Sequence, residues 1–187
     1  TRFGNQVVKD DIFHYVYGVL HSEQYRDTFA ADLKRMPPRI PLAMSRADFE
    51  AFAEAGRKLA DLHINYDAVE PYPLHEPIVA GIDEWELYRV TKMRWADKTT
   101  KMAIVFNRHI TLSDIPADAH RYLLGSRSAL EWLIDRYQVK TDKASGIVND
   151  PNDWCREHDQ PRYIIDLIKR VTRVSVDTMK IVDALPE

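Results

Sequence analysis

Hydrophobic residues recur every three or four positions over long stretches near both ends of the chain. This spacing places them on one face of an amphipathic helix. The helices predicted in this way span residues 10–21, 23–34, 129–137 and 163–182, a stretch from a cap at Ser45 or Asp48 to about 65, and a stretch from Pro116 to about 124. Prolines at 37, 38 and 41 end the second helix, because proline cannot donate the next helical hydrogen bond.

The middle of the chain is rich instead in β-branched and aromatic residues, which favour strands. Three strands are predicted at 85–95, 102–106 and 109–112, linked by a charged loop at 96–101 and a turn at Asn107-Arg108. Between 138 and 154 the pattern disappears, which predicts a long polar loop, and such loops are usually functional or disordered. The chain is therefore predicted to be one α+β domain over residues 1–187, mostly helical, with a small central antiparallel sheet.

Composition narrows the class of protein only a little. The 187 residues carry a net charge of −3, so the chain is not a uniformly basic nucleic-acid protein. A single cysteine, Cys155, excludes a disulfide framework and a cysteine zinc site. No apolar run approaches the roughly 20 residues that span a membrane. The chain begins at Thr1 without a signal peptide, which predicts a cytoplasmic fragment of a longer protein.

The charges are strongly segregated along the chain. Acidic residues dominate 48–86, where Arg57 and Lys58 are the only bases. Between 89 and 108 a single acid, Asp97, stands among six bases, namely Arg89, Lys92, Arg94, Lys98, Lys101 and Arg108. Further bases cluster at 34–46 and 162–180. Such segregation can build a locally positive face on a slightly acidic chain, and the alternative is a set of solvated faces that balance one another.

Catalytic motifs are absent from the sequence. It contains neither a phosphate-binding P-loop nor a Gly-x-Gly-x-x-Gly dinucleotide motif. The tetrapeptide 149–152 superficially resembles the Asn-Pro-Pro-aromatic motif of adenine-N6 methyltransferases but lacks the paired prolines and the following aromatic residue. The seven histidines are scattered and do not form a zinc-binding pattern. No catalytic or metal-binding residue is predicted.

Two segments instead favour binding. Strand alternation places Lys92 and Arg94 on one face of the first strand and Met93 and Trp95 on the other. A basic two-stranded ribbon of this kind fits the major groove of DNA, although an ordinary half-buried hairpin with a polar outer face has the same pattern. The loop 138–154 is dense in short hydrogen-bonding side chains that suit phosphates and base edges. Its alternative is a turn-rich connection whose side chains bond their own backbone.

Several segments of the sequence resemble a known protein family. The segments 127–132, 136–143 and 145–154 resemble the C-terminal specificity domain of Type ISP restriction–modification enzymes, which are single-polypeptide relatives of Type I systems. The segments 11–22, 56–63 and 174–182 agree, so the resemblance spans nearly the whole chain. One departure is the order Leu124-Gly125-Ser126-Arg127, where an Asn-Gly-Arg order is expected.

The resemblance implies a parent enzyme with a nuclease, an ATP-driven translocase and an adenine-N6 methyltransferase upstream of this domain. S-adenosylmethionine, ATP and Mg²⁺ would then be used upstream, and this fragment would hold no cofactor and catalyse no reaction. Its partners would be double-stranded DNA, at an asymmetric target site, and the methyltransferase and helicase-like domains of its own chain. The alternative is a domain that only docks the motor to the methyltransferase without reading bases.

Candidate site residues follow from the charge pattern and the resemblance together. Relatives of this kind read different sites, so residues that carry the resemblance are poor candidates for base readout. Base readout is therefore assigned to Arg94, Lys98, Lys101 and Arg108, phosphate contact to Arg127, Lys140, Thr141 and Lys143, and loop architecture to Asn149, Asn152 and Trp154.

Overall fold

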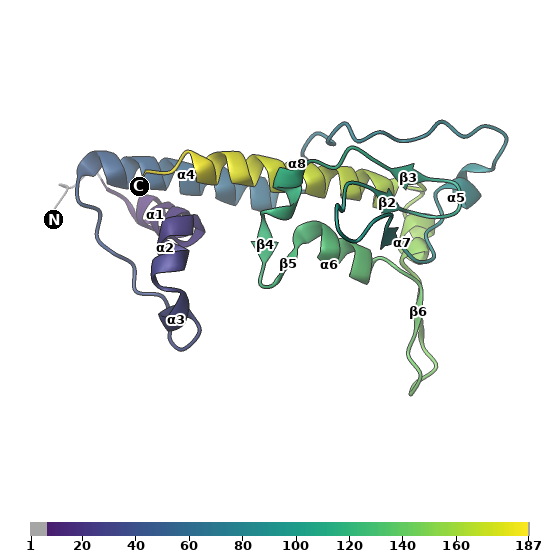
Figure 1. Cartoon of the computed structure of the whole chain (residues 1–187), viewed down its shortest axis with the longest axis horizontal. Helices are drawn as coiled ribbons and strands as arrows, with labels where there is room; N and C mark the ends of the chain where they lie inside the picture. Colours follow the sequence, from purple (N-terminus) through teal and green to yellow (C-terminus); the bar gives the residue numbers. More distant parts are fainter. Residues whose placement is uncertain (1–6, 187) are drawn as a thin grey trace. The chain divides into compact units, whose positions relative to one another are not determined.

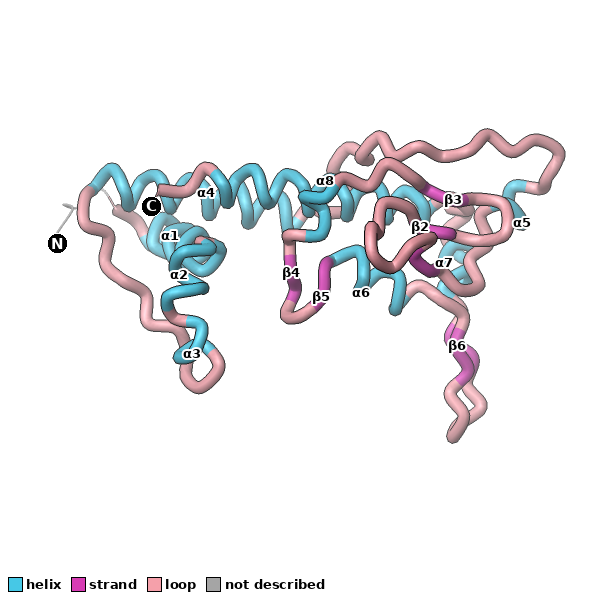
Figure 2. The backbone as a smooth tube through the Cα atoms, viewed as in Figure 1, coloured by secondary structure: helices cyan, strands magenta, loops and turns pink. Residues whose placement is uncertain are grey.

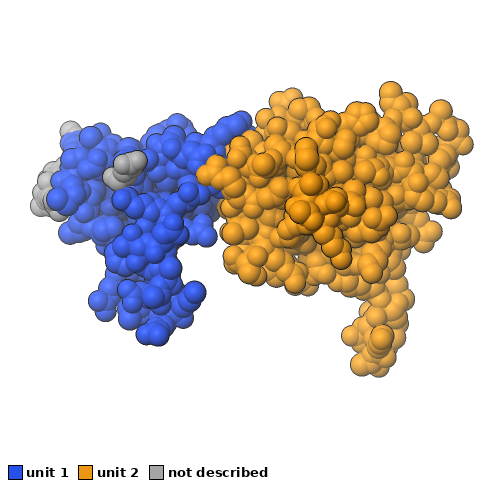
Figure 3. All heavy atoms as spheres, in the orientation of Figure 1, with its two compact units in different colours: residues 1–66, 177–187 blue, residues 67–176 orange. Residues whose placement is uncertain are grey.

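The computed structural model describes residues 7–186. The chain divides into two compact units (Figure 3). Unit 1 comprises residues 1–66 and 177–187, and unit 2 comprises residues 67–176. The long helix α8, Tyr163–Asp183, gives its residues up to 176 to unit 2 and the remainder to unit 1.

Unit 1 is helical (Figure 1). Its other helices are α1 (Lys9–His21), α2 (Glu23–Thr28), α3 (Ala30–Leu33) and α4 (Arg46–Ile64). The α4 helix begins where the sequence predicts, because Ser45 and Asp48 form a capping box in which each side chain accepts a hydrogen bond from the other's backbone N–H. A small core includes Tyr15 and Phe49, whose rings stack with their centres 5.0 Å apart.

The helices α1 and α4 touch at two glycines. A Cβ atom built on Gly56 would lie 1.8 Å from the backbone oxygen of His14, and one on Gly18 would lie 2.3 Å from that of Phe52. Neither distance is physically possible for a real side chain. Glycine inside a helix costs stability, and here it is what allows the two helix backbones to meet.

Unit 2 packs short strands and helices around the first part of α8 (Figure 2). A three-stranded antiparallel sheet contains β1 (Arg94–Trp95), β2 (Ile104–Val105) and β3 (Thr111–Leu112). The remaining elements are α5 (Glu84–Leu87), the 3₁₀ helix η1 (Ala117–His120), the hairpin of β4 (Leu123–Leu124) and β5 (Arg127–Ser128), α6 (Ala129–Arg136), the hairpin of β6 (Lys140–Thr141) and β7 (Val148–Asn149), and α7 (Pro151–Glu157). Fully buried side chains from the sheet, α6 and α8 form one core, among them Ile104, Leu130 and Ile165.

The register of the sheet confirms the predicted alternation on its first strand. Arg94 pairs with Val105, and Val105 pairs with Thr111, so these residues share the outer face. Trp95 pairs with Ile104 on the inner face. Met93 is buried and Lys92 is exposed, as alternation requires. The α+β class is likewise confirmed.

Two elements differ from their predictions in kind. The stretch 85–95 is a strand only at Arg94–Trp95, and its start is the helical turn α5, because the Asp83 carboxylate caps the N–H groups of Trp85 and Glu86. The helix predicted at 116–124 is reduced to η1. The chain then turns at Gly125, whose φ of +71° suits glycine, and Leu123–Leu124 pairs with β5.

Two further predictions are corrected in their extent. The helix predicted at 23–34 is divided into α2 and α3 at Phe29, whose backbone leaves the helical region. The loop predicted at 138–154 holds the β6–β7 hairpin and the start of α7, which Asp150 caps through the N–H of Asn152. Among the described helices, none is both long and apolar enough to cross a membrane.

Candidate nucleic-acid interface

The four cations assigned to base readout lie on the sheet or in its connecting loops, and they differ in whether a carboxylate pairs with them. The side chains of Arg94 on β1 and Lys98 in the following loop are exposed and form no ion pair within residues 7–186. The Lys101 ammonium lies 2.7 Å from a carboxylate oxygen of Glu131, and the Arg108 guanidinium lies 2.7 Å from one of Glu86. Two of the four are therefore available to DNA without breaking an ion pair in the described part of the chain.

The loop that carries Lys98 is held rigidly. The Asp97 carboxylate accepts hydrogen bonds from the N–H groups of Thr99, at 2.6 Å, and Thr100, at 2.8 Å. These bonds, that of Thr100 most of all, lower the pKa of Asp97. At the end of the loop, Lys101 adopts a positive φ of 51° and its ion pair lowers the pKa of Glu131. Because Glu131 also caps α6 at Ser128, the loop is fixed to the start of that helix.

Two of the phosphate candidates meet at a residue that sequence reasoning missed. Arg127 on β5 and Lys140 on β6 both reach the carboxylate of Asp135, at 3.7 Å and 3.1 Å. The Lys140 ammonium also donates to the backbone oxygen of Asp135, at 2.9 Å. The hydrogen bond and charge of Lys140 chiefly lower the pKa of Asp135, with smaller contributions from Arg127 and Arg136. The charges of three cations thus act on one carboxylate.

An aromatic ring completes this cluster. The Trp132 ring lies 5.2 Å from the guanidinium of Arg127 and 5.6 Å from that of Arg136. The signal for this contact was present in the sequence, since Trp132 and Arg136 are four positions apart in a predicted helix and therefore share a face. Thr141 and Lys143 lie farther out on the hairpin, where both are exposed.

The segment 89–108, here called the ribbon, and the β6–β7 hairpin are far apart in sequence but are joined by hydrogen bonds. The N–H of Val139, just before β6, donates to the backbone oxygen of Thr91 at 2.9 Å. The Asn152 side chain, just after β7, accepts from the N–H of Val90 at 2.9 Å and donates to its oxygen at 2.8 Å. Asn152 is only 5% exposed. The backbone just before β1 is therefore hydrogen-bonded by a residue that precedes β6 and by a residue that follows β7.

The other two residues assigned to loop architecture, Asn149 and Trp154, lie before and after Asn152 in the sequence. Asn149 is exposed on β7, opposite Lys140. The ring of Trp154 lies on α7 with the rings of His158 and Tyr163 each centred 4.1 Å away. Trp154 thus joins α7 to the first residue of α8.

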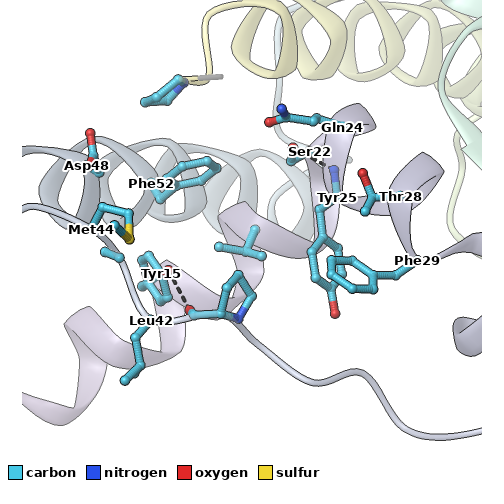
Figure 4. Close-up of a pocket in the computed structure, with 14 residues that line it drawn as sticks. Tyr15, Ser22, Gln24, Tyr25, Thr28, Phe29, Leu42, Met44, Asp48 and Phe52 are labelled. Carbon is cyan, nitrogen blue, oxygen red and sulfur yellow. Dashed lines mark hydrogen bonds between the residues drawn. The ribbon is translucent and has the colours of Figure 1, made fainter.

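Unit 1 has a separate cavity of about 240 Å³ (Figure 4). Aromatic and aliphatic side chains dominate its wall, including Tyr15, Tyr25 and Phe52. Several of its polar groups serve the fold. The Tyr15 hydroxyl donates to the backbone oxygen of Pro41 at 2.8 Å, and the Ser22 hydroxyl caps α2. The hydroxyl groups of Tyr15 and Ser22 therefore have structural roles in unit 1.

The candidate site is a surface that carries exposed cations on the ribbon and on the β6–β7 hairpin, as a surface that binds an anionic partner would. The family model described as the Type ISP C-terminal specificity domain matches residues 1–167. The chain belongs to this family, which confirms the resemblance found in the sequence. No curated protein matches the chain.

Three solved structures are similar to the chain over nearly all of its length. A nuclease-deletion mutant of the Type ISP restriction–modification enzyme LlaGI, in complex with a DNA substrate mimic, is 43% identical with a TM-score of 0.85, over 98% of this chain and 17% of that one. The ATP-dependent Type ISP enzyme LlaBIII, bound to DNA, is 38% identical with a TM-score of 0.86, over 98% and 11%. DrdV in a DNA complex is 36% identical with a TM-score of 0.78, over 97% and 18%. The chain thus spans less than a fifth of each relative.

Proposed function

We propose that this chain is the target-recognition module of a Type ISP restriction–modification enzyme and reads an asymmetric site in duplex DNA. It would hold that site for an upstream adenine-N6 methyltransferase and an ATP-driven translocase and nuclease. The family membership and the DNA in three similar structures support this role. The observation that carries it in this chain is the set of hydrogen bonds at Val90 and Thr91. These bonds connect the ribbon to the hairpin, and both elements carry exposed cations.

The proposal assigns all catalysis to the rest of the parent chain. The sequence contains neither a P-loop nor a dinucleotide motif, so S-adenosylmethionine, ATP and Mg²⁺ would be bound by upstream domains. Such an enzyme would act on DNA in the bacterial cytoplasm. Exposed apolar side chains on unit 1, including Phe13, Leu42 and Met44, suit contacts with the other domains of the same chain.

The first test is a binding matrix for the ribbon. In the full-length enzyme, Arg94→Ala, Lys98→Ala, Lys101→Ala and Arg108→Ala are each measured against every one-base variant of the site found by methylation mapping. A base contact is expected to cost about 1–3 kcal/mol and to relax preference at one base pair. We expect this result first for Arg94 and Lys98, which form no ion pair with any other described residue. Uniform losses across all rows would reassign the ribbon to the DNA backbone.

The second test concerns the hairpin lysines. Lys140→Ala and Lys143→Ala are expected to weaken binding equally on cognate and random duplexes and to lower the salt dependence by roughly one ion each, because phosphate contacts carry no sequence information. The loss should be larger for Lys140, since its removal also leaves Asp135 with one fewer cation. Lys58→Ala, at an exposed position in unit 1, is the control. A changed methylation site in either variant would contradict the assignment.

A further inference from the structure

The β6–β7 hairpin exposes two aliphatic side chains that the fold does not use. Figure 1 shows the hairpin extending away from the remainder of unit 2. Every residue from 140 to 149 is exposed. Ile147 is 67% exposed and Val148 is 57% exposed, in a segment that otherwise carries polar, charged or small side chains. Leaving such side chains in water forgoes the free energy that burial would supply, so their position suits a surface met on binding.

The tip of the hairpin is already ordered. The Asp142 carboxylate accepts hydrogen bonds from the N–H groups of Ala144, at 3.0 Å, and Ser145, at 2.7 Å, and from the Ser145 hydroxyl, at 2.8 Å. The N–H of Asp142 donates to the backbone oxygen of Ile147 at 2.8 Å, and Gly146 supplies the positive φ of 71° that the turn requires. Ile147 is thus presented in one position, and little ordering entropy is lost on binding.

The charges around the tip favour duplex DNA over an apolar protein surface. Lys140 and Lys143 lie on the same hairpin. Its one carboxylate, Asp142, is engaged inside the turn. A two-stranded ribbon fits the major groove, and isoleucine is among the apolar side chains that contact or separate base pairs. We propose that the hairpin enters a groove of the target duplex and that Ile147 makes an apolar contact with base pairs there that is independent of their sequence. This inference rests on the proposed function.

The experiment compares Ile147→Ser with Ile78→Ser in the full-length enzyme. Ile78 is the matched control, because it lies in the same unit, is fully exposed and is outside the hairpin. The probe is a duplex carrying the site found by methylation mapping, titrated at several salt concentrations. Ile147→Ser is expected to weaken binding by about tenfold with an unchanged salt dependence, since an apolar contact releases no counterions. Ile78→Ser is expected to bind like the wild type.

Other outcomes separate the possible failures. A wild-type enzyme that does not bind the duplex would overturn the proposed function itself. Normal wild-type binding with equal affinities for the two variants would overturn only the role of Ile147. This holds also if Ile147→Ser impairs methylation without weakening DNA binding, which is the result expected of a residue that contacts another protein domain. A photoreactive benzoylphenylalanine at position 147 is a second measurement that does not depend on the serine variant. It should cross-link to DNA, whereas the same group at position 78 should not, and the reverse would also overturn the inference.

Discussion

Replacing Gly56 with alanine is expected to destabilise the pairing of α1 and α4 by about 3 kcal/mol or more. The added methyl group would lie 1.8 Å from the backbone oxygen of His14, and a backbone atom cannot move aside as the end of a long side chain can. The two helices must therefore separate, which loosens the packing around Tyr15 and Phe49. The loss outweighs the gain of up to about 1 kcal/mol that alanine brings to a helix.

Hydrogen exchange in the full-length enzyme measures this effect locally. Amides of α1 and α4 should exchange faster in the Gly56→Ala variant, while those of unit 2 serve as an internal reference. Glu50→Ala is the matched control, because it lies on the same helix with a side chain that is 59% exposed, and surface changes of this kind stay within about 0.5 kcal/mol. Unchanged protection of α1 in the Gly56→Ala variant would show that the helices do not meet at this residue.

The sequence revealed the elements whose cause is local. The start of α4 depends on Ser45 and Asp48, three residues apart, and the apolar spacing of α1 lies within one segment. The failure at 85–95 has a local cause at its start, where Asp83 caps α5, and a distant cause further along the segment. The N–H and oxygen of Val90 are bonded by Asn152, 62 residues later, so this backbone needs no neighbouring strand. Strand propensity describes the residues correctly and says nothing of a side chain that replaces the strand partner.

The same distinction holds for the candidate site. The cations could be found by reading the sequence, because their type and density are visible there. The sequence could not show which of these cations pair with an acid, because Lys101 meets Glu131 and Arg108 meets Glu86 only in the folded chain. The role of Asp135 between Arg127 and Lys140 is of the same kind. Folding therefore ranks four similar cations that the sequence leaves equal.

Replacing Glu76 with glutamine is expected to cost unit 2 about 3 kcal/mol. The Glu76 carboxylate lies 2.9 Å from the Arg162 guanidinium and 2.6 Å from the Lys169 ammonium, and the side chains of Glu76 and Lys169 are each only 14% exposed. Glutamine would remove the carboxylate that the two cations share and leave Arg162 with Asp166, at 3.5 Å, as its remaining acid. The Arg162 guanidinium also donates to the Tyr88 hydroxyl and lies over its ring, so the chain leading into the ribbon depends on the same contact.

The pH dependence of stability tests this ion pair independently. Burial alone would raise the pKa of Glu76, but hydrogen bonds and charge from Arg162 and Lys169 lower it below the ordinary value of 4.5. A carboxylate whose pKa is lower in the folded state contributes its full stability above the unfolded pKa and loses it as the pH falls through the folded pKa. Unit 2 should therefore lose stability below about pH 4.5. Glu76→Gln should remove that part of the acid sensitivity.

The control for this experiment is Glu84→Gln, a glutamate at an exposed position in the first turn of α5. Denaturant unfolding at pH 7 and at several values below pH 5 gives the free energies for the three proteins. At pH 7, Glu76→Gln should be the least stable of the three, and the gap to the wild type should narrow as the pH falls, because acid removes from the wild type the charge that the variant already lacks. A gap that stays constant down to acid pH would mean that Glu76 stabilises unit 2 by packing and not by its charge.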